Sequence, residues 1–78
     1  MLFHDRLKAL REDRDLGQEE VAEALHISRT ALANYENAIR EPSLSLIVKI
    51  ADYYDVTLDY LLCRTNFMTS FSKSNKLK

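Results

Sequence analysis

Residues 18–37 read QEEVAEALHISRTALANYEN and contain two short helical patterns separated by a break. In the first pattern, residues 18–25, apolar side chains recur at spacings of three and four, which is typical of one buried helix face. The break falls at His26. Ser28 follows, a residue type that caps a helix by accepting hydrogen bonds from amides of its first turn. The stretch therefore predicts a helix, a tight turn and a second helix over residues 29–37.

The second helix of this pair has an outer face of short polar side chains without any acid. Two short helices joined by such a turn are the plan of a helix-turn-helix, in which the second helix lies in the major groove of DNA. Arginine can pair with guanine there, asparagine with adenine, and threonine or alanine can contact a thymine methyl group. The residues on this outer face are Arg29, Thr30, Ala33, Asn34 and Asn37.

The rest of the chain also predicts helices, so we expect an all-α fold. Apolar residues at helical spacing predict a helix over residues 3–14, and Pro42 marks a turn before a helix over residues 44–54. Ser43 and Thr57 are expected to cap the last two helices, the second of which runs to Leu62. The side chains expected to be buried in these two helices are Leu44, Ile47, Val48, Ile50, Ala51, Tyr54, Leu58, Leu61 and Leu62.

Length and composition place limits on the function. With 78 residues, we expect one small domain over residues 1–64 and a polar, basic tail over residues 65–78, with no separate domain for a small-molecule effector. The tail contains Phe67 and Phe71, which could belong to a short sixth helix that docks on the domain or on a second subunit, or to a frayed terminus. No apolar run approaches the roughly 20 residues of a membrane span, and no secretory signal is visible, so we expect a cytoplasmic protein.

Charge argues against a nucleic-acid ligand at first sight. The net charge is −1, and residues 1–63 carry 7 bases against 12 acids, whereas phosphate neutralisation normally supplies much of the affinity for DNA. A few well-placed bases near the groove, doubled by dimerisation, would meet this objection. The positions of those bases therefore decide whether DNA binding is physically reasonable.

Catalytic and metal-binding patterns are missing from the sequence. Cys63 is the only cysteine and there are two histidines, too few for a zinc site or an internal disulfide. There is no glycine-rich phosphate loop and no nucleophile with a spaced base. We expect no metal, no cofactor and no enzymatic activity.

The order of these motifs resembles a known family. The helix pair, the Arg-Glu-Pro-Ser-Leu loop from Arg40, the Ile-Ala pair and the Val-Thr-Leu-Asp-x-Leu-Leu run from Val56 are similar to the lambda-repressor-like or Cro-type helix-turn-helix family, also called the xenobiotic-response-element family. The resemblance covers about residues 3–64. It implies a compact bundle of five helices that binds double-stranded operator DNA, usually as a symmetric dimer.

The resemblance also implies roles for individual residues. The positions facing the groove correspond to Arg29, Thr30, Ala33 and Asn34, and Arg11 and Glu36 correspond to a salt bridge between the first and third helices. Gln18 corresponds to a glutamine that holds a phosphate and can brace the reading helix. The residues implied or expected to contact DNA phosphates are Gln18, Ser28, Asn37, Arg40 and Ser43.

Some positions depart from the family pattern. Asp15, His26 and Ala38 stand where the family commonly has glycine, and alanine tolerates a left-handed backbone poorly, so the loop at Ala38 is expected to be altered or strained. Gly17 replaces the usual capping Thr or Ser. A dimer surface is predicted at Tyr60, Leu62, Phe67 and Phe71.

These patterns favour a sequence-specific transcriptional regulator, most simply a repressor that binds a palindromic operator as a homodimer. Two other readings stay open at this point. One is an antitoxin that binds operator DNA and a toxin protein, with the tail as its toxin-binding segment. The other is a protein-interaction module that keeps the fold without binding DNA, as the acidic balance suggests.

Overall fold

The computed structural model describes residues 1–68, and these form five helices without a strand. Their order along the chain is α1 (Phe3–Asp13), α2 (Gln18–Leu25), α3 (Arg29–Glu36), α4 (Leu44–Tyr54) and α5 (Leu58–Leu61). The all-α five-helix prediction is therefore confirmed. Residues 66–68 are not helical, and the remainder of the expected sixth helix, including Phe71, lies outside the described residues.

Short-range chemistry sets the helix ends, as expected from the sequence. The hydroxyl of Ser28 accepts from the amide of Ala31 at 3.0 Å, and Ser43 and Thr57 cap α4 and α5 in the same way. Gly17 precedes α2 and offers no side-chain cap, which leaves that helix start weaker. The predicted caps are confirmed at all three hydroxyl positions.

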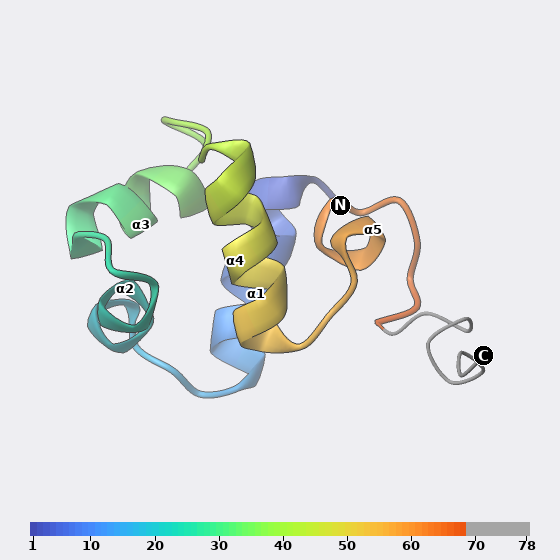
Figure 1. The fold of residues 1–78 in the computed structure, drawn as a ribbon, viewed down its shortest axis with the longest axis horizontal. Coiled ribbons are helices and arrows are strands. Elements are labelled where there is room, and N and C mark those ends of the chain that lie inside the picture. Colours follow the sequence, from blue (N-terminus) through green and yellow to red (C-terminus); the bar gives the residue numbers. More distant parts are fainter. Residues whose placement is uncertain (69–78) are drawn as a thin grey trace.

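Every helix contributes to the core, with leucines from α1, α2, α3 and α5 and with Ile50, Ala51 and Tyr54 from α4. Its fully buried members include Leu7, Leu25, Leu32 and Leu61, and α2 packs on α3 while α1 contacts α3 and α5. Figure 1 shows α2 and α3 together at one end of the molecule, with α5 at the other end beside the N-terminus. The helices α2 and α3 therefore pack against α1 and α4, because α1 contacts α3 and α4 contacts α2.

Four of the side chains expected to be buried are not. Leu44 and Val48 on α4 are 74% and 40% exposed, and Leu58 and Leu62 are each 39% exposed. On α4 only Ile50, Ala51 and Tyr54 are fully enclosed, while Leu46 and Ile47 pack against the core and stay partly exposed. The broad apolar surface of α4 is therefore half core and half solvent-facing.

Candidate nucleic-acid interface

The turn between α2 and α3 is set by a left-handed residue and by a core contact. His26 has φ 61° and its amide closes the last turn of α2, while Ile27 packs against the core. Histidine tolerates this backbone region better than most residues, so glycine is not required here. The turn orients α3 so that Leu32 is fully buried and the opposite side of the helix faces outward.

The outward side of α3 carries the predicted base-reading residues. Arg29 and Thr30 are exposed, and Ala33 and Asn34 are partly exposed, so the structure brings all four to one face. Within the described residues, the Arg29 guanidinium forms no hydrogen bond or ion pair. Its donors are therefore available to an external acceptor.

A network of polar side chains holds α3 from behind. Arg11 of α1 donates to both carboxylate oxygens of Glu36, at 2.8 Å and 3.0 Å, so the predicted ion pair is confirmed. Gln18 donates its amide N–H to Glu36 at 3.1 Å, so α2 is also joined to the end of α3, while the predicted phosphate contact of Gln18 stays a prediction. The Glu36 side chain is only 1% exposed, so this acid is turned inward, away from the exposed face of α3.

The predicted phosphate-binding residues surround α3. Ser28 and Ser43 use their oxygens as caps, and the Ser28 hydroxyl keeps its O–H to donate, whereas the Ser43 hydroxyl also shares a hydrogen bond with the hydroxyl of Ser45 at 3.2 Å. Asn37 and Arg40 are exposed in the segment that follows α3. Ala38 in the same segment has φ 62°, so the loop is strained, which is one of the two outcomes expected for it, and Asp15 and His26 are left-handed as well, with φ 58° and 61°.

Several basic side chains of this acidic chain form hydrogen bonds with backbone carbonyl groups of the chain itself. Arg6 and Arg14 donate to the carbonyl oxygens of Tyr60 and Tyr54, and Lys49 donates to the carbonyl of Leu25. Together with Arg11, these cations donate to groups within the chain and stabilise the fold, although Arg14 and Lys49 also stay exposed. Arg29 and Arg40 are exposed as well, on α3 and the segment after it.

Sequence reasoning missed three of these structural cations, Arg6, Arg14 and Lys49. Arg6 is 7% exposed and stacks over the Tyr60 ring at 3.8 Å, a contact that also covers one of the predicted dimer-surface residues. Its position between Phe3 and Leu10 on the apolar stripe of α1 was a usable signal. Lys49 joins α4 to the end of α2, because its Nζ donates to the carbonyl of Leu25 at 3.2 Å. No local sequence pattern predicts this contact.

Other chemistry finds no support in the described part of the chain. No group of three or more His, Cys, Asp or Glu side chains there could hold a metal ion. Among the same residues, every helix is too short or too polar to cross a bilayer. The contacts of Arg11 and Gln18 with Glu36 hold α3 in place and leave its outer face exposed.

Comparison with known families gives a decisive match, because the model described as "Helix-turn-helix" aligns with residues 7–61. This chain belongs to the helix-turn-helix family. The matched segment runs from α1 to the end of α5, so the family assignment covers the whole described bundle apart from its ends. The match is to the Cro and lambda-repressor type that the sequence resembles.

Curated relatives of this helix-turn-helix chain are transcriptional regulators. It is 33% identical over 76 residues to the HTH-type transcriptional activator BcrR of Enterococcus faecalis, covering 97% of this chain and 37% of the relative. It is 40% identical over 62 residues to the HTH-type transcriptional regulator ImmR of Bacillus subtilis (strain 168), covering 80% of this chain and 49% of the relative. The cryptic phage CTXphi transcriptional repressor RstR of Vibrio cholerae is 33% identical over 61 residues, 78% of this chain and 55% of that protein. The chain thus spans between about a third and just over half of these relatives.

A solved structure shares the same fold. The P22 c2 repressor, crystallised in complex with a synthetic operator, superimposes with a TM-score of 0.74 at 22% identity, covering 80% of this chain and 94% of that chain. At this identity the likeness concerns the fold.

Proposed function

We propose that this protein binds a specific, palindromic site on double-stranded DNA as a homodimer and regulates transcription, most simply as a repressor. The observation that carries the proposal is the outer face of α3, where Arg29 and Thr30 are exposed on a helix whose other side is fixed by Arg11, Gln18 and Glu36. A rigid helix with free donors is what base-edge recognition requires. The regulatory names of the relatives agree with this reading, and they include both an activator and repressors.

Within this proposal, one set of residues contacts base edges and another set contacts phosphates. Arg29, Thr30, Ala33 and Asn34 read bases, and the residues around them hold the backbone and set the register of α3 in the groove. The phosphate-holding residues are Gln18, Ser28, Asn37, Arg40 and Ser43.

Several narrower statements belong to the same proposal. The protein acts without catalytic activity, cofactor or metal, and it works in the cytoplasm, where its DNA ligand would lie. The predicted domain boundary, residues 1–64 followed by a tail, stays a prediction. So does the dimer role of Tyr60, Leu62, Phe67 and Phe71, the last of which lies outside the described residues.

The test begins with selection of bound sequences from random DNA, which should recover two inverted half-sites. Arg29→Ala should then lower the binding free energy for the selected site by about 1 to 3 kcal/mol and leave the melting temperature unchanged. Arg64→Ala is the matched control, because it removes an exposed arginine that follows α5 in the chain, and α5 lies at the opposite end of the molecule from α3 (Figure 1). Failure to enrich any sequence would favour the interaction-module reading, and a large loss of stability in Arg29→Ala would show that this residue is structural.

A further inference from the structure

A hollow of about 340 Å³ lies between α2 and the first residue of α3. The side chains that line it are Glu19, Ala22 and Glu23 of α2, Ile27 of the turn, and Arg29 of α3. Ala22 belongs to the core and Ile27 packs against it, so the part of the hollow nearest the core is apolar. The other three residues are charged and exposed. The hollow therefore brings two carboxylates beside the first of the predicted base-reading residues.

The helical repeat of α2 places both acids at this hollow. Glu19 and Glu23 are four residues apart, so they lie on one face of the helix. α2 packs on α3, and the lining of the hollow shows that this face lies beside the start of α3. Glu20 is also exposed on α2 but does not line the hollow. The three acids of this helix have the same charge and differ in position.

The charged groups of the hollow have no other partner among the described residues. Glu19, Glu23 and Arg29 form no ion pair there, either with one another or with a further group. The Arg29 guanidinium is therefore attracted by two carboxylates without being fixed by either. Arginine carries its donors as a planar fork on a long stem, so rotation of the side chain can bring the fork over the hollow or out toward a ligand.

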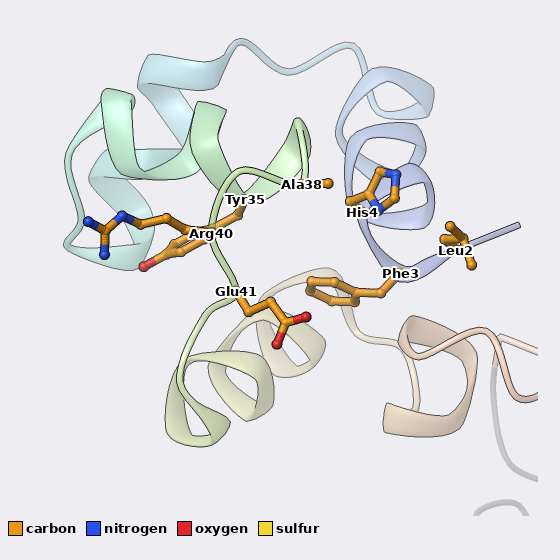
Figure 2. Close-up of a pocket in the computed structure, with 7 residues that line it drawn as sticks. All are labelled: Leu2, Phe3, His4, Tyr35, Ala38, Arg40 and Glu41. Atoms are coloured by element: carbon orange, nitrogen blue, oxygen red, sulfur yellow. The ribbon is translucent and has the colours of Figure 1, made fainter.

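Arg40, the other exposed arginine close to α3, has different surroundings. It lines a second pocket, of about 380 Å³, together with Leu2, Phe3, His4, Tyr35, Ala38 and Glu41. Figure 2 shows that the Arg40 and Glu41 side chains leave the segment after α3 in opposite directions, with Glu41 directed toward Phe3 of α1. The acid next to Arg40 in the chain is therefore turned away from its guanidinium.

We propose that Glu23, together with Glu19, is a positioning residue for Arg29 and thereby determines how strictly the protein discriminates between DNA sequences. The inference rests on the proposed DNA-binding function and concerns the same reading helix. In the free protein the carboxylates draw the guanidinium toward the hollow, and Arg29 leaves it for an acceptor that binds it better. Guanine is such an acceptor, because its O6 and N7 accept two hydrogen bonds from the arginine fork. At another base pair the guanidinium stays with the acids.

The same carboxylates disfavour nonspecific contacts with DNA. General affinity for DNA depends on contacts between basic side chains and phosphates. A phosphate that approached Arg29 from the side of α2 would also meet Glu19 and Glu23, and their repulsion would offset its attraction to the arginine. Specificity is a difference between two affinities, so weakening the wrong complexes raises it. Part of the acidic charge of this chain thus serves sequence discrimination.

The test uses the full chain and the DNA site recovered by selection from random sequences. The base pair read by Arg29 is the position at which Arg29→Ala loses discrimination. Glu23→Gln should reduce discrimination at that base pair by about threefold, the size expected for an exposed pair of charges, and leave the melting temperature unchanged. Glu20→Gln is the matched control, because it removes the same charge from the same helix outside the hollow. Glu41→Gln is a second control beside Arg40, and both controls should keep the discrimination of the wild type.

A double-variant cycle separates positioning of Arg29 from a general effect of charge. Glu23→Gln should raise the affinity for random-sequence DNA more than Glu20→Gln does, and this difference should vanish in the Arg29→Ala background. Glu23→Asp keeps the charge and should retain most of the discrimination.

Equal discrimination in Glu23→Gln and Glu20→Gln would overturn the positioning role and leave the proposed function standing. So would a difference in random-sequence affinity that persists without Arg29, because the acids would then act on DNA directly. A wild-type chain that enriches no sequence would overturn the proposed function and this inference together.

Discussion

Arg11 and Glu36 form a buried ion pair with two parallel hydrogen bonds, which joins α1 to the last residue of α3. The Arg11 side chain is 12% exposed and that of Glu36 is 1% exposed. The pair raises the pKa of Arg11 above its ordinary value, chiefly through the hydrogen bond to Glu36. Arg11 also donates to the carbonyl of Leu16 at 2.9 Å, so the same guanidinium holds the link between α1 and α2.

Glu36→Ala should lower the free energy of unfolding by about 3 to 5 kcal/mol, because it leaves the Arg11 charge enclosed without a partner. Urea unfolding at neutral pH measures the loss. Arg64→Ala, which breaks the exposed pair with Asp59, should have no measurable effect on stability and serves as the control. A loss for Glu36→Ala as small as that of the control would show that the pair does not support the fold.

Gln18→Glu should be more damaging than Gln18→Ala. The alanine variant removes one hydrogen bond to Glu36 and should cost about 1 kcal/mol, whereas the glutamate variant places a second carboxylate beside a buried one. Urea unfolding of both variants at neutral and at acidic pH measures the difference, which should shrink where carboxylates become protonated. Equal stability of the two variants at neutral pH would contradict the brace that the structure shows between α2 and α3.

Ala38→Gly should stabilise the protein by about 1 kcal/mol. Ala38 has φ 62°, a left-handed conformation that costs an L-residue roughly 1 to 2 kcal/mol and costs glycine almost nothing. Thermal unfolding provides the measurement. Ala24→Gly, at an exposed position within α2, should have the opposite sign and lose up to about 1 kcal/mol. A destabilised Ala38→Gly variant would mean that the loop depends on the alanine side chain.

Tyr54 should make the protein sensitive to alkali. Burial, and next the negative charge of Glu36, raise the pKa of Tyr54 to about 12 from an ordinary value of 10.0. The folded state therefore holds the proton more tightly than the unfolded state. The resulting stability is fully present below pH 10 and is lost as pH rises toward 12, by about 2 to 3 kcal/mol.

Tyr54→Phe removes this step in stability against pH, which urea unfolding over the alkaline range would detect. At neutral pH the variant should be as stable as the wild type or more stable by about 1 kcal/mol, since the buried Tyr54 hydroxyl has no hydrogen-bond partner among the described residues. Tyr53→Phe, a change in the neighbouring and more exposed ring, is the control and should keep the alkaline loss. A wild-type profile in Tyr54→Phe would assign the loss to other groups.

Much of the fold follows from local chemistry that the sequence displays. The hydroxyl caps, the helical spacing of leucines and the turn before α3 each depend on residues within four positions of one another, so their effects can be read along the chain. The face that carries Arg29 and Thr30 follows from the same spacing. The ion pair of Arg11 and Glu36 was predicted only through family resemblance, because no local pattern connects two residues on separate helices.

The sequence by itself determined the helices, their caps and the polar outer side of α3, because these depend on contacts between near neighbours. Only the tertiary structure decided which apolar side chains stay outside and which cations turn inward. Leu44 and Val48 satisfy the helical pattern of a core face but are exposed, while Arg6 breaks that pattern and is buried. Periodicity records which residues share a side of one helix, but burial depends on whether another helix covers that side. That is a relationship between residues far apart in the chain.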